Sequence, residues 1–233
     1  MHSLPVALVS GASKGLGKRI ANSLSLSGYA VVGCARTVPE DPDSGVDYQI
    51  ADVTDEHSVQ SLFKFIQYRY GRLDAVICNA GMASMNPLVF SPKSSAMNML
   101  ETNLVGTMIV SREAIRLLRR SEHGRIVTVT SVAVPLKIEG ESIYSASKAA
   151  IEQFTRVIAR ELAPYGITCN SIGPGPIDTD LIAGVPKEII DELANRLVGG
   201  KKSTFNDVTN VIDFFLSDSS DAITGQILYL GGA

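Results

Sequence analysis

Residues 6–17 read VALVSGASKGLG, and this stretch decides the fold of the 233-residue chain. Its first four residues form an apolar run that suits a buried strand of a parallel sheet. The glycines Gly11, Gly15 and Gly17 follow in the spacing Gly-x-x-x-Gly-x-Gly, and residues 18–27 then carry apolar side chains on one helical face. A strand, a glycine-rich turn and a helix in this order are the context of a dinucleotide-binding fingerprint.

Glycines at such a turn let the backbone approach a pyrophosphate, and the helix that follows offers it unpaired N–H groups. No Gly-Lys-Ser/Thr closes the stretch, so it is not a P-loop. The alternative is a glycine-rich turn that binds nothing. The candidate cofactor-binding residues of this turn are Gly11, Ser13, Lys14, Gly15, Leu16 and Gly17.

Strand-like and helix-like segments alternate along the rest of the chain. Seven strands are expected in all, at residues 6–9, 29–35, 46–50, 75–78, 125–129, 167–172 and 226–230. Helices are expected at residues 18–27, 55–70, 100–119 and 143–163, with Thr54 as the N-cap of the second. Repeated βα units predict an α/β fold, a doubly wound parallel sheet with helices on both faces. No linker or repeat divides residues 1–233, which predicts one domain.

Tyr144 and Lys148 form the second informative pattern, because in a helix they lie one turn apart on the same face. A nearby ammonium favours the ionised form of a phenol, which would make Tyr144 a proton donor and acceptor. Ser131, at the end of an expected strand, could hold a substrate oxygen beside it. The alternative is a solvated helix face. Ser131, like the glycine turn, follows the end of an expected strand, where parallel sheets bind their ligands.

Together with Asn79-Ala80-Gly81 and Asn103, these motifs resemble the classical short-chain dehydrogenase/reductase family, from Val6 to Gly232. The segments 174–179 (PGPIDT) and 223–226 (ITGQ) also resemble family segments, and the likeness is greatest to reductases of the 3-oxoacyl-carrier-protein type. The resemblance implies a single Rossmann-type domain with a small substrate lid near residues 180–205.

The resemblance also implies a reaction, hydride transfer between nicotinamide C4 and a carbonyl or secondary alcohol. Tyr144 would be the acid/base, Ser131 would orient the oxygen, and Lys148 would hold the ribose and favour ionisation of Tyr144. Asn103 would support a water that connects Lys148 to solvent, or would simply bond to backbone. Further cofactor contacts are implied at Asp52, Val53, Asn79, Ala80, Gly81, Pro174, Gly175, Ile177 and Thr179.

The residues at the end of the second strand predict the cofactor. Relatives that prefer NAD carry aspartate there, whereas this chain has Ala35 followed by Arg36. Arg36 can grip a phosphate in bidentate fashion and Lys14 adds a point charge, so NADP(H) is favoured over NAD(H). Both side chains could instead be solvated surface charges, and Asp52 could be a loop residue that caps the next helix.

The substrate is less determined. A 3-oxoacyl thioester or another small ketone is possible, and apolar residues at 181–197 would cover it or pack on the core. Glu122 and Tyr165 replace basic docking residues that carrier-protein reductases often have, although Arg119, Arg120 and Arg125 are nearby, and the 199–206 segment also departs from the family pattern. The alternatives for the function are a sugar-nucleotide epimerase or dehydratase and a noncatalytic dinucleotide-binding regulator.

Composition fits a cytoplasmic enzyme. Hydrophobic residues make up 45% of the chain and its net charge is −3, which gives no reason to expect nucleic acid. No apolar run approaches the ~20 residues that span a membrane, and no secretion signal is recognisable. Cys34, Cys78 and Cys169 are expected to be buried, reduced thiols, and no metal site is expected. Apolar surface on residues 143–163 predicts a homodimer or homotetramer.

Overall fold

A computed structural model describes residues 4–179, 182 and 184–233. Its centre is one seven-stranded sheet in the order β3-β2-β1-β4-β5-β6-β7, and all neighbouring strands are parallel. The strands are β1 (Val6–Ser10), β2 (Ala30–Ala35), β3 (Val46–Ile50), β4 (Ala75–Cys78), β5 (Arg125–Val129), β6 (Thr168–Gly173) and β7 (Ile227–Tyr229). The strand order reverses between β1 and β4, so the carboxyl ends of these two strands open a crevice at which such sheets bind ligands.

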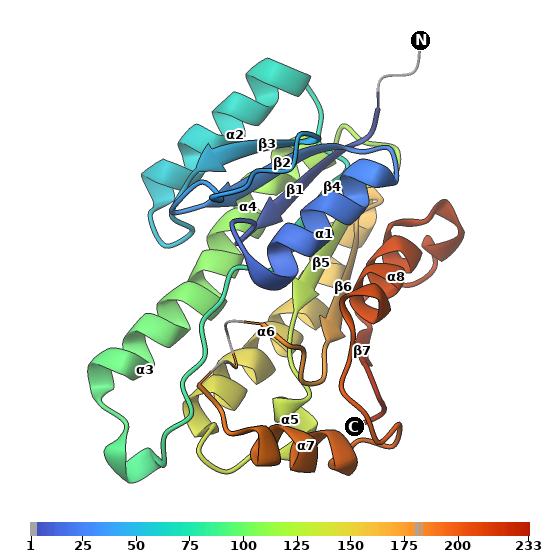
Figure 1. Ribbon diagram of the computed structural model, residues 1–233. Helices are drawn as coiled ribbons and strands as arrows, with labels where there is room; N and C mark the ends of the chain where they lie inside the picture. Colours follow the sequence, from blue (N-terminus) through green and yellow to red (C-terminus); the bar gives the residue numbers. More distant parts are fainter. Residues whose placement is uncertain (1–3, 180–181, 183) are drawn as a thin grey trace.

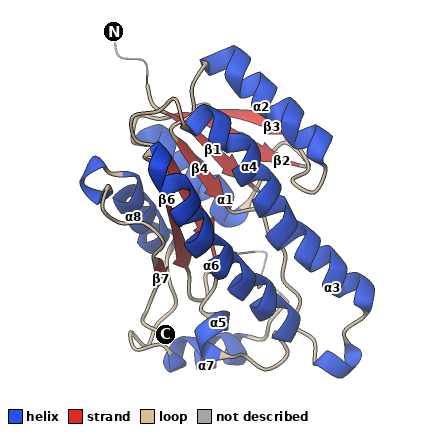
Figure 2. Cartoon of the chain, turned by 180° about the vertical axis from the view of Figure 1, so that it is seen from behind, coloured by secondary structure: helices blue, strands red, loops and turns tan. Residues whose placement is uncertain are grey.

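Helices cover both faces of the sheet (Figures 1 and 2). The helices α2 (Glu56–Tyr70), α4 (Gly106–Leu118) and α6 (Ser142–Leu162) pack their buried side chains on one face, in a cluster with Leu8, Val76 and Ile126. The helices α1 (Gly15–Leu26) and α8 (Phe205–Leu216) pack on the other face, in a second cluster with Val9, Ile77 and Val127. Alternate side chains of each strand are therefore buried in two separate hydrophobic cores, one on each face, as a doubly wound sheet requires.

The predicted strands agree with the structure to within one residue or so at each end, and the predicted parallel sheet is confirmed. The N-cap prediction at Thr54 is wrong. Asp55 is the N-cap of α2, and its Oδ1 accepts from the N–H groups of His57 at 2.9 Å and Ser58 at 3.4 Å. Helix α1 also begins earlier than expected, at Gly15, because the glycine turn itself enters the helix.

The helix expected at 100–119 begins seven residues earlier. It runs from α3 (Lys93–Leu100) through a π-helical turn (Glu101–Val105) into α4. Pro92 precedes α3, where its fixed backbone can start a helix. The π-turn carries Asn103 with its side chain fully buried, and such turns are frequent at functional sites.

Smaller elements complete the end of the molecule toward which the strands point. Beyond the carboxyl ends of β5 and β6 lie α5 (Ala133–Leu136) and α7 (Lys187–Arg196), as Figure 1 shows. Of the 3₁₀ turns in the described chain, Leu88–Phe90 precedes α3, whereas Ala163–Tyr165 and Asp218–Ser220 lie at the opposite end of the sheet. The backbone of 198–199 pairs with 231–232, so the last residues of the chain hold the end of α7.

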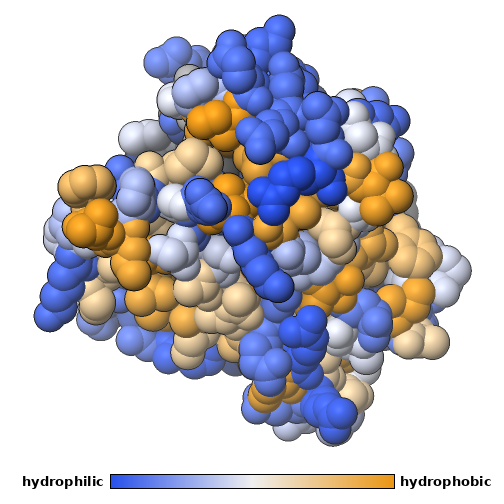
Figure 3. Space-filling model, turned by 90° about the horizontal axis from the view of Figure 1, so that it is seen from below, coloured by the Kyte–Doolittle hydropathy of each residue, from blue (hydrophilic) through white to orange (hydrophobic). Residues whose placement is uncertain are grey.

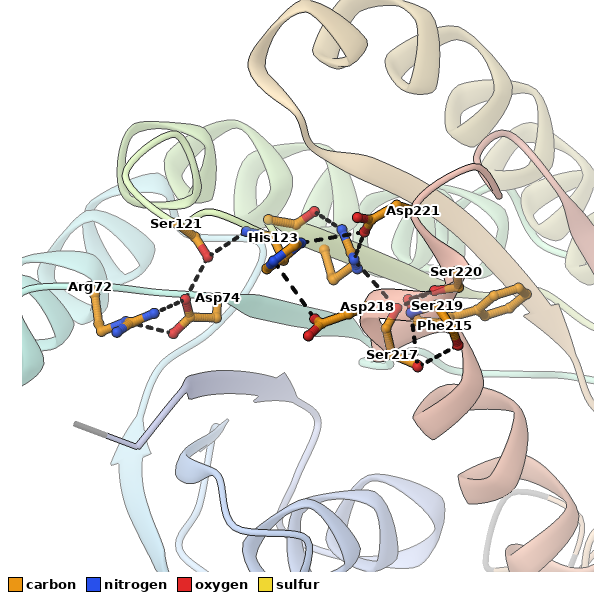
Figure 4. Close-up of polar contacts among 12 residues, drawn as sticks. Arg72, Asp74, Ser121, His123, Phe215, Ser217, Asp218, Ser219, Ser220 and Asp221 are labelled. Atoms are coloured by element: carbon orange, nitrogen blue, oxygen red, sulfur yellow. Dashed lines mark hydrogen bonds and ion pairs between the residues drawn. The ribbon is translucent and has the colours of Figure 1, made fainter. Parts of the chain in front are cut away.

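A polar network closes the opposite end of the sheet (Figure 4). The Asp74 carboxylate, just before β4, accepts from Val6 N at 2.8 Å, from Arg72 Nη2 at 2.6 Å and from Ser121 Oγ at 2.5 Å. Arg125 at the start of β5 pairs with Asp221 beyond α8. These contacts tie the first strand, the central strands and the C-terminal segment together.

The three cysteines are free and buried, as predicted, in β2, β4 and β6. Among the residues that the structure describes, no group of histidine, cysteine, aspartate and glutamate side chains could hold a metal ion. In the same part of the chain, every helix is too short or too polar to serve as a membrane span.

Candidate active site

The glycine turn after β1 is closed against the start of α1. Gly11 and Gly15 have φ angles of +69° and +54°, which favour glycine. A Cβ on Gly17 would lie 2.1 Å from the carbonyl oxygen of Gly11 and 2.4 Å from Nδ2 of Asn79. Only a residue without a side chain fits at Gly17, because the backbone on the other side cannot move away cheaply.

Asn79 and Ser10 join this turn to the end of β4. The Asn79 amide donates to the carbonyl oxygens of Ser10 at 3.0 Å and Gly11 at 3.3 Å. The Ser10 hydroxyl accepts from the N–H groups of Asn79 and Ala80, both at 3.1 Å. Sequence analysis finds Asn79 through its motif but misses Ser10, whose role depends on the neighbouring strand rather than on local spacing.

The N-terminus of α1 lies in the crevice without a side-chain cap. Lys14 is its N-cap residue but makes no capping hydrogen bond, and the first turn has no acidic residue. Such an end attracts an anion, because its first N–H groups are unpaired and the helix dipole is positive there. Ala35 ends β2, and Arg36 follows it with an exposed side chain.

Asp52 and Val53 lie past β3. Oδ1 of Asp52 accepts from the N–H of Thr54 at 3.0 Å and from its hydroxyl at 2.8 Å. Asp52 is thus a loop residue that holds Thr54 and does not cap α2, whose N-cap is Asp55, and its carboxylate has a second oxygen for other contacts. Val53 is buried against Gly106, where a Cβ would come within 2.7 Å of Val53 Cγ2.

The segment after β6 reaches back to the glycine turn. A Cβ on Gly15 would lie 3.8 Å from the Thr179 side chain, so residues 179 and 15 face each other across the crevice. Pro174 accepts a hydrogen bond from the N–H of Val132 at 3.2 Å, and Gly175 N donates to Ser203 Oγ at 3.1 Å. Ile177 is buried. Of the lid expected near residues 180–205, residues 180, 181 and 183 lie outside the described residues.

Ser131, Tyr144 and Lys148 meet at the carboxyl end of β5. Tyr144 and Lys148 are both buried on α6, and Lys148 Nζ lies 5.8 Å from the centroid of the Tyr144 ring. Lys148 Nζ donates to the carbonyl oxygen of Val129 at 2.8 Å. The Ser131 hydroxyl hydrogen-bonds to the Tyr144 phenol and accepts from Ala133 N at 3.1 Å.

Asn103 lies beside these residues but holds the loop after β4. Its Oδ1 accepts from Met82 N at 2.8 Å, and its Nδ2 donates to Met82 O at 2.9 Å and to Ser147 Oγ at 3.0 Å. A Cβ on Gly81 would lie 3.2 Å from Asn103 Oδ1 and 3.4 Å from Lys148 Nζ. The Asn103 side chain therefore bonds mainly to backbone, and Gly81 lets the loop pass over Lys148.

Comparison with known proteins identifies the family. A family model described as Enoyl-(Acyl carrier protein) reductase, of the short-chain alcohol dehydrogenase type, matches residues 11–232. The 3-oxoacyl-[acyl-carrier-protein] reductase FabG of Escherichia coli strain K12 is 32% identical over 97% of this chain and 96% of its own. The chain belongs to the short-chain dehydrogenase/reductase family.

Other relatives agree. FabG of Pseudomonas aeruginosa is 31% identical over 97% of this chain and 96% of its own. The ligand-free structure of aldohexose dehydrogenase from Thermoplasma acidophilum superposes with a TM-score of 0.90 at 28% identity, over 98% of this chain and 93% of that one. The chain is thus an oxidoreductase of the short-chain dehydrogenase/reductase family, similar both to 3-oxoacyl-[acyl-carrier-protein] reductases and to an aldohexose dehydrogenase.

Burial dominates the electrostatics of this short-chain dehydrogenase/reductase site. Desolvation raises the pKa of Tyr144 to about 12, although its hydrogen bond to Ser131 acts in the opposite direction. Desolvation also lowers the pKa of Lys148 to about 8. The sequence predicts that Lys148 favours ionisation of Tyr144, whereas in this structure burial sets the direction of both pKa shifts, and each shift favours the neutral group.

Apolar side chains line the site near Tyr144. Tyr144 clusters with buried Met99 and Ala133, and Met82 and Ile138 pack against this cluster. Viewed toward the carboxyl ends of the strands, the surface of this short-chain dehydrogenase/reductase shows separate apolar patches with hydrophilic side chains between them (Figure 3). A substrate here would contact both kinds of side chain.

Proposed function

We propose that this chain is an NADP(H)-dependent carbonyl reductase or alcohol dehydrogenase, with Tyr144 as the general acid and base. One observation carries the proposal. The phenol of Tyr144, hydrogen-bonded to Ser131 and next to the ammonium of Lys148, lies at the carboxyl edge of the sheet that holds the glycine turn. A proton donor and a dinucleotide-type anion site at one sheet edge are what carbonyl reduction requires.

The residues present fit a dinucleotide. The glycine turn has no side chains at Gly11, Gly15 and Gly17 that would keep a pyrophosphate away from the backbone. The start of α1, which has no side-chain cap, offers N–H groups to this anion. When bound, the nicotinamide supplies or accepts the hydride. The phosphate contacts would come from residues 11–17 and Thr179, and Asp52 with its second carboxylate oxygen would contact the adenine side.

Each residue of the catalytic group has a separate task. Tyr144 delivers a proton from its hydroxyl to the substrate oxygen during reduction and takes it back during oxidation. Ser131 holds that oxygen in place. Lys148 lowers the cost of a negative charge on Tyr144 when both groups are shielded from water. Asn103 and Gly81 hold the neighbouring loop so that Lys148 stays buried.

Two basic residues support NADP(H) over NAD(H). Arg36 is exposed directly after β2. Ala35 occupies the position where NAD-preferring relatives carry an aspartate, so no negative charge would repel a 2′-phosphate there. A guanidinium there can bind a 2′-phosphate in bidentate fashion. Lys14 at the start of α1 adds a second positive charge.

Substitution of Tyr144 by Phe tests the proposal. We expect Tyr144→Phe to lower kcat by about 10²-fold or more, because it removes the proton donor, and to leave NADPH affinity within about twofold of wild type. Titration by nicotinamide fluorescence, followed by turnover with ketones, 3-oxoacyl thioesters and keto-sugars, measures both. Tyr68→Phe, on the exposed face of α2, is the matched control. Full turnover in Tyr144→Phe would overturn the assignment, and equal affinity for NADH and NADPH would overturn the cofactor preference.

A homodimer or homotetramer is part of the same proposal. On α6, Ile151 and Ile158 are buried and Phe154 packs partly buried against the core, whereas Val157 remains 43% exposed. The apolar surface that α6 leaves exposed suits a second copy of the chain. A small substrate lid around α7 and a location in the cytoplasm also belong to the proposal.

A further inference from the structure

Glu141 lies on the same helical face as the catalytic pair. It is the N-cap residue of α6, three residues before Tyr144 and seven before Lys148. The helical hydrogen bonds of α6 begin at Glu141, whose carbonyl oxygen accepts from Ser145 N at 2.7 Å. The spacing i, i+3, i+7 places the three side chains along one stripe. Glu141 therefore begins the row that ends in Lys148.

The Glu141 carboxylate does not cap the helix that it begins. An acidic N-cap residue ordinarily accepts a hydrogen bond from the first N–H groups, but Glu141 makes none. Its side chain is half-buried, and within the described part of the chain no hydrogen bond or ion pair of its carboxylate is found. Half-buried carboxylates usually have a partner, because burial without one is costly.

Glu141 lies next to the apolar side of the candidate site. The hydrophobic cluster around Tyr144, one helical turn from Glu141, includes the partly buried Met82, Ala83, Ile138 and Ile143. Burial raises the pKa of Glu141, and the negative charge of Glu141 adds to desolvation in raising the pKa of Tyr144. Helical spacing also places the Glu141 and Tyr144 side chains one turn apart, so a group that contacts the phenol lies near the carboxylate.

We propose that the Glu141 carboxylate accepts a hydrogen bond from a hydroxyl or ammonium group of the substrate close to its reacting carbonyl. This specificity-determining role rests on the proposed function, because it takes Tyr144 as the residue that contacts the carbonyl oxygen. It selects carbonyl compounds that carry a donor and disfavours those that carry a nearby carboxylate, since like charges repel in a partly desolvated site.

Four derivatives of acetone form a matched panel, with an ammonium, hydroxyl, methyl or carboxylate group on one methyl carbon: aminoacetone, hydroxyacetone, butanone and acetoacetate. The measured quantity is kcat/KM of each variant divided by that of wild type for the same substrate, which cancels the intrinsic reactivity of each carbonyl. Glu141→Gln removes the charge and keeps an acceptor. Glu141→Ala removes both.

We expect Glu141→Gln to lower kcat/KM for aminoacetone by about tenfold, to raise it for acetoacetate, and to change butanone by less than about twofold. Glu141→Ala should in addition lower kcat/KM for hydroxyacetone. The matched control is Glu139→Gln, an exposed carboxylate on the same loop, which should leave all four ratios near one. Binding of 1-amino-2-propanol by calorimetry gives a readout without turnover, and Glu141→Gln should weaken it.

An equal change for all four substrates would show a structural role and overturn the inference, as would failure of wild type to reduce any of the panel. The proposed function is judged separately. If Tyr144→Phe keeps full activity on another ketone, the proposed function fails. If Tyr144→Phe is inactive but Glu141→Gln changes kcat/KM by the same factor for all four substrates, only the inference fails.

Discussion

The ammonium of Lys148 is buried beside the Tyr144 ring and donates one hydrogen bond, to the carbonyl oxygen of Val129 at 2.8 Å. Burial lowers its pKa from 10.5 to about 8. Since one pKa unit corresponds to ~1.4 kcal/mol, the charged form costs about 3 kcal/mol in the folded state. Burial of the charged lysine therefore lowers the stability of the folded chain.

We therefore expect Lys148→Met to raise the free energy of unfolding at pH 7 by about 2 kcal/mol, since loss of the hydrogen bond to Val129 offsets about 1 kcal/mol. The same change should abolish turnover. A depressed lysine pKa means that the unfolded chain binds more protons between pH 8 and 10.5, so wild-type stability should gain from this group as pH rises through that window. Below pH 8 both states are protonated and the cost is constant.

Urea unfolding of wild type and Lys148→Met at pH 7 and pH 10 measures both effects. The difference between the two proteins should shrink at the higher pH. Lys64→Met, on the exposed face of α2, is the control and should stay within about 0.5 kcal/mol of wild type. A destabilised Lys148→Met at pH 7 would contradict the prediction.

The residues of the site differ in how far sequence predicts them. Tyr144, Lys148 and Ser131 follow from helical spacing and strand ends, and the structure brings them together. The direction of the Tyr144 pKa shift does not follow from the sequence, because the burial of Tyr144 depends on Met99, Ala133 and other distant parts of the chain. Glu141 was missed for the same reason, since its lack of a partner is a property of the folded loop and not of the local sequence.

At the scale of elements, α8 was not predicted although its pattern is readable. Buried Val208, Ile212 and Phe215 recur at helical spacing. Thr204 and Asp207 form a capping box, in which Asp207 N donates to Thr204 Oγ1 at 3.2 Å and Thr204 N donates to Asp207 Oδ2 at 2.7 Å. The N-cap Thr204 lies within residues 199–206, the segment that departs from the family pattern. The family resemblance therefore gives no indication of where α8 begins.

Thr204→Ala should lower the free energy of unfolding by about 1 kcal/mol, because it leaves the first N–H groups of α8 unpaired. Helix α8 covers one face of the sheet, so the effect should appear in global unfolding. Thermal or urea unfolding measures it. Thr209→Ala, one turn further along the helix, should change stability by no more than about 0.5 kcal/mol. Equal effects of the two changes would mean that the capping box does not stabilise α8.

At the scale of the whole molecule, the two ends of the sheet have different tasks. The carboxyl ends carry the glycine turn and the Tyr144 group, whereas the other end carries the network around Asp74 and Arg125 (Figure 4). Strand order explains why sequence predicts the first end and not the second. Ligand sites at carboxyl ends follow from any parallel sheet, but a network between β1, β4 and the turn before β5 requires knowing which strands are neighbours.

Asp74 should make stability depend on pH in the acid range. Burial alone would raise the pKa of this carboxyl, but hydrogen bonds from Arg72, Ser121 and the Val6 N–H lower it overall. A group with a lowered folded pKa contributes stability above its unfolded pKa of about 4, and loses it as pH falls through the folded pKa. At pH 7 the carboxylate holds the first strand of the chain to a central one.

We expect Asp74→Ala to lower the free energy of unfolding by about 3 kcal/mol at pH 7, since it leaves Arg72 and the Val6 N–H without this acceptor. The difference from wild type should narrow steadily below about pH 4, where the wild-type carboxylate takes up a proton. Urea unfolding at a series of pH values measures it. Asp191→Ala, exposed on α7, should follow wild type throughout. A cost that stays the same at pH 3 would mean that packing around Asp74, and not its charge, closes this end of the sheet.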